Sequence, residues 1–201
     1  MRLIIEDKVF KKLSNYKRGK IVFSESFAQI GNLESINKAL SRLTQKGLLV
    51  RLAQGIYLYP KQDKELGVLY PSVEEIAEAI VKRDKARIIP TGVQALNKLG
   101  LSTQVPMNVV FLTDGAPRII KIGKRTIKFK KTTPKNFACK SEVCGLVIQA
   151  LREIGSENFT SEQLEKIKQV LKNETTELLA HDARIAPAWI AKIILSAIPN
   201  K

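Results

Sequence analysis

The sequence predicts an α+β protein with two domains, and three observations lead to this prediction. Residues 1–64 have the periodicities of a helix, a short strand, two further helices and a β-hairpin, in that order. Between residues 65 and 135, helical segments alternate with short β-prone runs. From Ser141 onward the pattern is helical. We therefore expect one domain over residues 1–64 and a mixed helix/β-sheet domain over residues 65–201.

The composition is that of a globular protein with a large excess of positive charge. Hydrophobic residues make up 44% of the 201 positions and charged residues 26%, which are ordinary values. Lys and Arg number 34 against 19 acidic residues, a formal net charge of +15. Such a field attracts polyanions, so nucleic acid is the first candidate partner and an acidic membrane surface the second. A solvated cationic surface without a partner is the alternative.

The positive charge is confined to the first two thirds of the chain. Residues 1–64 contain 13 basic and 5 acidic side chains, residues 65–135 contain 13 and 6, and residues 136–201 contain 8 of each. The aromatic content of 6% argues against a stacking platform for single-stranded nucleic acid. Duplex nucleic acid is therefore the partner that we expect for residues 1–135.

Targeting and cysteine signals point to the cytoplasm. No apolar run approaches the ~20 residues that span a bilayer. The N-terminal residues turn acidic at Glu6 and Asp7, too early for a signal peptide. Cys139 and Cys144 lie five positions apart in a helical pattern, where we expect buried packing rather than a disulfide framework.

The clearest predicted element is the third helix of the first domain. Asn32 is a suitable N-cap and Gly47 a suitable left-handed terminator. Ile36, Leu40 and Leu43 form an apolar stripe between them. The neighbouring elements predicted for this domain are a helix over 4–13, a strand over 21–23, a short helix over 27–30 that Ser24 or Ser26 would cap, and a hairpin over 48–59. This order fits a winged helix-turn-helix.

The remaining residues are predicted to form a linker and the second domain. Residues 61–72 have the composition of a linker, and Ser72 with Glu75 makes a capping box for the helix that follows. The predicted strands are 87–89, 108–112, 118–122 and 126–130. The further predicted helices are 93–99, 142–154, 161–172, 174–181 and 187–197.

Polar side chains on the third helix make it the main candidate for a DNA-recognition helix. Opposite its apolar stripe lie Ser35, Asn37, Lys38, Ser41, Arg42 and Gln45. Arg51 and Gln54 lie on or near the tip of the hairpin that follows. Lys and Arg neutralise phosphates, while a single Arg, Asn or Gln side chain can make two hydrogen bonds to the edge of one base. The alternative is the ordinary polar face of a surface helix.

A second group of basic residues lies in the hairpin predicted over 118–131. Its candidate phosphate contacts are Arg118, Lys121, Lys124, Arg125 and Lys128. Alternation places Ile127 and Phe129 on one face and Lys128 and Lys130 on the other. A solvated sheet face explains the same pattern, so both interpretations stay open at this point.

The sequence contains little that is typical of catalysis. His181 is the only histidine, and its spacing from Cys139 and Cys144 does not match a zinc motif. Glycine-rich phosphate loops and nucleophile elbows are absent, and Thr113-Asp114-Gly115 is typical of a turn. We therefore expect a binding protein without a metal or cofactor rather than an enzyme. The apolar cluster around Trp189 fits domain core, or alternatively a surface for a partner protein.

Four stretches within residues 1–135 carry a family resemblance. They are Ile36-Asn37-Lys38-Ala39-Leu40-Ser41-Arg42-Leu43 with Gly47-Leu48-Leu49, the wing Arg51-Leu52-Ala53-Gln54-Gly55-Ile56-Tyr57-Leu58-Tyr59-Pro60 with its Gly-x-Tyr ending, the segment from Pro90 to Leu101, and Val109-Val110-Phe111-Leu112-Thr113-Asp114-Gly115 with the basic hairpin. In these stretches the chain resembles the AbiEi-like antitoxins of abortive-infection, type IV toxin–antitoxin systems. The last 65 or so residues match no pattern of that family.

The resemblance implies a repressor of its own promoter that also counteracts a nucleotidyltransferase-like toxin. The DNA contacts it implies are Ser35, Lys38, Arg42, Arg51, Arg118, Lys121 and Arg125. Two other functions stay open: a winged-helix regulator whose second domain senses a small ligand, and a metal-dependent nucleic-acid-modifying enzyme using Asp114 with a nearby Glu. The operator, the toxin, any direct contact with it and the oligomeric state are not determined by the sequence.

Overall fold

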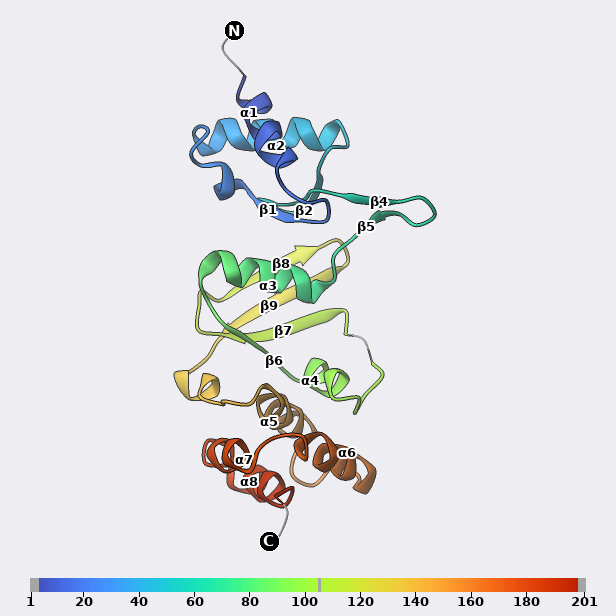
Figure 1. Cartoon of the computed structure of the whole chain (residues 1–201), viewed down its shortest axis with the longest axis vertical. Coiled ribbons are helices and arrows are strands. Elements are labelled where there is room, and N and C mark those ends of the chain that lie inside the picture. Colours follow the sequence, from blue (N-terminus) through green and yellow to red (C-terminus); the bar gives the residue numbers. More distant parts are fainter. Residues whose placement is uncertain (1–3, 105, 199–201) are drawn as a thin grey trace. The chain divides into compact units, whose positions relative to one another are not determined.

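The computed structural model describes residues 4–104 and 106–198, and it has the α+β fold that the sequence predicts (Figure 1). The chain divides into two compact units. One contains the residues up to Ala79 together with Lys121–Lys124, and the other contains Ile80–Ile120 and the residues from Arg125 onward. The domain boundary expected after residue 64 stays a prediction, because compactness alone does not show which segment folds independently.

The first unit packs two helices on a small antiparallel sheet. Its elements are α1 (Ile5–Ser14), β1 (Ile21–Phe23), the 3-10 helix η1 (Ser24–Phe27), α2 (Leu33–Gln45), β2 (Val50–Ala53) and β3 (Ile56–Leu58). The strand order is β1-β3-β2, and Leu58 pairs with Ile21 on one side and Val50 on the other. Leu13, Phe27 and Leu40 are fully buried in the core between these elements.

Helix α2 begins and ends where its capping signals predict. The Asn32 side chain accepts a hydrogen bond from the Ser35 backbone N–H at 2.9 Å. At the other end Gly47 has φ +71°, a conformation that residues with a Cβ adopt only at a cost. The predicted stripe of Ile36, Leu40 and Leu43 is buried. Local sequence signals therefore determine this helix.

The short helix between β1 and α2 differs from its prediction. A 3-10 helix over Ser24–Phe27 replaces the α-helix expected over 27–30. Of the two predicted caps, Ser24 donates its Oγ instead to Asn37 Oδ1 of α2 at 2.7 Å, and Ser26 Oγ accepts the Phe23 backbone N–H at 3.4 Å. The Phe27 side chain is 0% exposed, so tertiary packing sets the path of this segment.

The segment expected to be a linker contains a β-hairpin. Strands β4 (Lys61–Asp63) and β5 (Gly67–Leu69) pair antiparallel. Asp63 Oδ1 accepts from the backbone N–H groups of Glu65 and Leu66 at 2.9 and 3.1 Å, which closes the turn. An aspartate turn therefore gives these exposed residues a regular structure.

The division between the two units falls inside α3 (Val73–Asp84). The predicted capping box is confirmed at its start. Glu75 donates its backbone N–H to Ser72 Oγ at 3.1 Å, and its side chain accepts from the Ser72 N–H at 2.7 Å.

The following elements form a four-stranded mixed sheet with one short helix. They are β6 (Ile88–Pro90), α4 (Val93–Lys98), β7 (Asn108–Thr113), β8 (Arg118–Ile122), β9 (Arg125–Lys131) and the 3-10 helix η2 (Pro134–Phe137). The strand order is β6-β7-β9-β8, with β7 and β9 parallel. Phe111 and Phe129 are register partners whose rings stack with centroids 6.0 Å apart.

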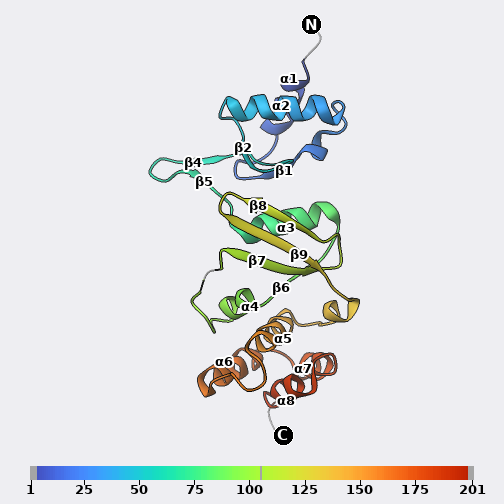
Figure 2. The same cartoon turned by 180° about the vertical axis from the view of Figure 1, so that it is seen from behind.

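Four helices complete the second unit (Figure 2). They are α5 (Glu142–Ile154), α6 (Ser161–Leu171), α7 (Thr176–Ala183) and α8 (Ala188–Leu195), close to the predicted bounds. Their core includes Cys144, Leu151 and Ile194, each 0% exposed. The buried carboxylate of Asp182 accepts the backbone N–H groups of Lys140 and Ser141, both at 2.9 Å, and so joins α7 to the start of α5. Among the described helices, none has both the length and the apolar character that crossing a bilayer requires.

Candidate nucleic-acid interface

A hollow of about 320 Å³ lies between α2 and the β2–β3 hairpin in the first unit. We call it the α2–hairpin groove. Its lining residues are Ser24, Glu25, Leu33, Asn37, Ser41, Arg51, Gln54, Gly55 and Tyr57. Four of the residues predicted to contact DNA are among them: Asn37 and Ser41 from α2, and Arg51 and Gln54 from the hairpin.

Local geometry explains why these side chains converge. Asn37 and Ser41 are four positions apart and so share one face of α2. On the hairpin, Arg51 is exposed and pairs with Tyr57 of β3, next to an irregularity in the β2–β3 register between Arg51 and Ala53. Gly55 turns the chain with φ +69°. Helix and hairpin thus present polar groups to the same hollow.

Asn37 is oriented by the rest of the unit. Its Oδ1 accepts from Ser24 Oγ at 2.7 Å, and this bond leaves the amide NH₂ group as a donor. Since Ser24 is 3% exposed, the partner is itself held by burial. A side chain with a preset orientation loses less conformational entropy when it binds a base edge.

The other predicted residues of α2 lie outside the groove lining. Arg42 reaches Glu6 of α1 at a nitrogen–oxygen distance of 3.8 Å, and Lys46, which follows α2 and was not a predicted contact, reaches the same carboxylate at 2.5 Å. Lys38 pairs with Glu34 of its own helix at 2.7 Å. The three basic side chains are at least 60% exposed, whereas the Glu6 side chain is only 14% exposed. The pair that is exposed on both sides, and therefore weak, is Lys38 with Glu34. Gln45 is also exposed, and Ser35 is half-buried.

Several groups in this unit were not among the predicted contacts. Leu33 lines the groove and is 53% exposed, although its spacing of four from Asn37 could have identified it. Tyr57 lines the groove from β3 even though its residue is only 4% exposed, which strand alternation alone does not indicate. Outside the groove lining, the loop before β1 carries two cations that lie on aromatic rings. Lys20 Nζ is 3.6 Å from the Tyr16 ring centroid, and the Arg18 guanidinium is 4.3 Å from that of Tyr59.

The basic hairpin β8–β9 has the alternation that the sequence predicts. Ile127 and Phe129 are buried, at 0% and 2% exposure. The predicted contacts Lys121, Lys124, Arg125 and Lys128 are all exposed, as are Lys130 and Lys131. The β9 strand therefore separates an apolar face from a cationic one.

Arg118 differs from its neighbours on this hairpin. Its guanidinium pairs with Asp84 at the end of α3 and lies 5.4 Å from the Phe129 ring centroid. Burial lowers the pKa of Arg118 below its usual range. The side chain is 29% exposed, so it is engaged within the protein to a degree that the sequence did not indicate.

Asp114, the residue considered for catalysis, serves as a structural anion. Its Oδ1 accepts from the Arg87 backbone N–H at 2.7 Å and its Oδ2 from Arg87 Nε at 2.8 Å. These two bonds, the backbone one first, hold the pKa of Asp114 below its usual range. In residues 4–104 and 106–198, no group of three or more His, Cys, Asp or Glu side chains is arranged to hold a metal ion.

Comparison with known proteins identifies the family of this chain. No curated protein matches the sequence. Residues 8–179 match a family described as a family of unknown function, DUF6088. The match covers both the α2–hairpin groove and the basic β8–β9 hairpin, and the chain belongs to this family.

Proposed function

We propose that this chain binds duplex DNA through a winged helix in its first unit, with α2 as the recognition helix. The observation that carries the proposal is the α2–hairpin groove, where Asn37, Ser41, Arg51 and Gln54 meet. The element order and the β1-β3-β2 strand order support a winged helix. The excess of 13 basic over 5 acidic residues in 1–64 supports a polyanionic partner.

The proposed binding mode follows from dimensions and chemistry. An α-helix is about 10–12 Å wide with its side chains, which suits the ~12 Å major groove. In this mode Asn37 and Ser41 face base edges, and Arg51 and Gln54 of the hairpin contact the adjacent backbone. Lys38, Arg42 and Lys46, whose basic side chains are all at least 60% exposed, contact phosphates and release counterions.

The β8–β9 hairpin would supply further phosphate contacts. Lys121, Lys124, Arg125 and Lys128 are the side chains we assign to this role, because all four are exposed. Arg118 is assigned instead to holding α3 against the sheet, since it is paired with Asp84. Residues 136–201, with 8 basic and 8 acidic side chains, add no net charge to this electrostatic attraction.

The biological role we propose is that of an antitoxin and autorepressor acting in the cytoplasm. It rests on the resemblance of residues 1–135 to AbiEi-like antitoxins. In this role, occupation of the promoter excludes polymerase, and the same protein counteracts a nucleotidyltransferase-like toxin. Co-expression with the product of the adjacent gene tests the second part: rescue of growth supports it, and growth arrest despite the full-length chain would contradict it.

The DNA-binding proposal is tested by fluorescence anisotropy with the purified full-length chain. The two probes are its own upstream DNA and a scrambled duplex of equal length and composition, each measured at low and at physiological salt. We expect tighter binding to the upstream DNA that persists at physiological salt. Equal, weak binding to both duplexes that disappears with salt would mean a general polyanion attraction, and the proposal would be wrong.

A further inference from the structure

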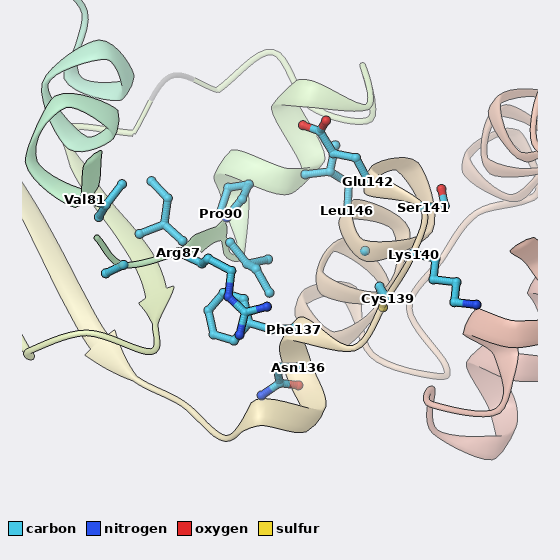
Figure 3. Close-up of a pocket in the computed structure, with 14 residues that line it drawn as sticks. Val81, Arg87, Pro90, Asn136, Phe137, Cys139, Lys140, Ser141, Glu142 and Leu146 are labelled. Carbon is cyan, nitrogen blue, oxygen red and sulfur yellow. The ribbon is translucent and has the colours of Figure 1, made fainter. Parts of the chain in front are cut away.

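The second unit contains a cavity of about 480 Å³, bordered by β6, the loop containing η2 and the first turns of α5 (Figure 3). This volume falls in the range of about 300–1,000 Å³ typical of small-molecule sites. The apolar part of the lining consists of Val81, Ala86, Ile88, Ile89, Pro90, Phe137 and Leu146. All lining residues belong to one compact unit, so the cavity does not depend on how the two units are placed.

Arg87 contributes a guanidinium to this lining, and its side chain is 62% exposed. The carboxylate of Asp114 accepts both its backbone N–H, at 2.7 Å, and its Nε–H, at 2.8 Å. Its guanidinium lies 4.7 Å from the Phe137 ring centroid, and Figure 3 shows the two side chains together at the cavity. Asp114 accepts the Nε–H of Arg87, so the two Nη groups of Arg87 remain as donors. None of the described residues accepts a hydrogen bond from them.

The remaining charged side chains at the cavity determine which ligand fits. Figure 3 shows the Glu142 carboxylate on the α5 side, away from Arg87, and Lys140 Nζ pointing away from the cavity. The favourable place for an anionic group is therefore at Arg87. A second anion at the opposite end would be repelled by Glu142.

We propose that this cavity binds an amphipathic organic anion, with an apolar aromatic body of two or three rings and one anionic group. The anion bonds the Nη groups of Arg87, and the body lies against Phe137, Pro90 and Leu146. This site is separate from the proposed DNA interface and does not rest on it, since no lining residue belongs to the α2–hairpin groove.

The test compares two probes on the full-length chain by fluorescence titration. 8-Anilino-1-naphthalenesulfonate has the proposed chemistry, and N-phenyl-1-naphthylamine has nearly the same ring body without the sulfonate. We expect saturable binding of the sulfonate at one site. Arg87→Met should weaken sulfonate binding about tenfold or more, the loss of a hydrogen-bonded charge pair, and change binding of the neutral probe less than twofold.

Lys140→Met is the matched control, because it removes the same charge from a lining residue whose amine points away. It should change the affinity for either probe less than twofold. An equal loss of affinity for the sulfonate probe in Arg87→Met and Lys140→Met would overturn the proposal. It would indicate that the probe is attracted by net charge alone.

A second measurement uses only the wild-type chain, so it does not depend on whether a variant folds. A photoreactive azide of the same sulfonate is crosslinked to the wild-type chain, and the labelled peptides are identified by mass spectrometry. Labelling concentrated in peptides covering 81–90 and 136–146 is the expected result. Labelling spread over the apolar surface, or concentrated elsewhere, would show that the probe does not use this cavity.

Discussion

At the scale of single residues, Asn37 is the side chain on which the proposed DNA contact most depends. Ser24 holds its carbonyl at 2.7 Å, and it faces the α2–hairpin groove. If it bonds a base, Asn37→Ala should cost about 1–3 kcal/mol on the upstream DNA and much less on a scrambled duplex. Gln45→Ala, on α2 but outside the groove lining, is the control in the anisotropy titration. Equal losses for the two variants would contradict this orientation of α2.

Arg42 gives a second residue-scale prediction with a different signature. It is 63% exposed and pairs with Glu6 at 3.8 Å, outside the groove lining. We therefore expect Arg42→Ala to weaken binding to specific and scrambled duplexes by similar factors, as for a phosphate contact. A loss of about 1–3 kcal/mol confined to the upstream DNA would instead make it a base contact. Unchanged affinity for both duplexes would remove this side of α2 from the interface.

The two cysteines are predicted to be unreactive. Burial raises the pKa of both Cys139 and Cys144 from 9.0 to about 11. Their thiols therefore stay protonated at pH 8, with a thiolate population roughly a hundredfold below that of an ordinary thiol. Iodoacetamide labelling followed by mass spectrometry should be slow in the native chain and fast in urea. Rapid native labelling would mean that these thiols are not shielded as described.

At the scale of elements, the end of α2 depends on Gly47. Its φ of +71° favours glycine, and a Cβ built there would meet no atom within 4 Å. Gly47→Ala should therefore lower the free energy of unfolding by about 1–2 kcal/mol through backbone strain alone. Gly47→Asn, which tolerates this conformation better, should cost less. Urea denaturation measures both, and equal stability of Gly47→Ala and wild type would contradict the strain.

Comparison of α5 with η1 shows where element prediction works. The bounds of α5, Glu142–Ile154, are those predicted, because Ser141 caps Cys144 N at 3.0 Å and Gly155 ends the helix with φ +86°. Both signals are local. For η1, by contrast, Ser24 bonds Asn37, thirteen positions away, and Phe27 is buried in the core of the first unit. A window of neighbouring residues cannot contain that information.

At the scale of the whole molecule, charge governs affinity. For about six to ten phosphate contacts, affinity should fall about 10³–10⁵-fold between 50 and 200 mM salt. Lys124→Gln on the β8–β9 hairpin should reduce the slope of log affinity against log salt concentration by about one. Lys172→Gln, exposed in the third of the chain without net charge, is the matched control and should leave the slope unchanged. Identical slopes for the two variants would exclude this hairpin from the interface.

By itself the sequence determined the α+β class, the capped helices α2, α3 and α5, the alternation of β9 and the location of positive charge. These depend on local periodicity, capping and side-chain count, which act over a few neighbouring residues. Only the tertiary structure decided that Asn37 and Arg51 line one groove, that Arg118 forms an ion pair with Asp84, and that Arg87 lines a cavity. Each of these requires contacts between residues far apart in the chain, and such contacts form only when apolar surfaces pack together.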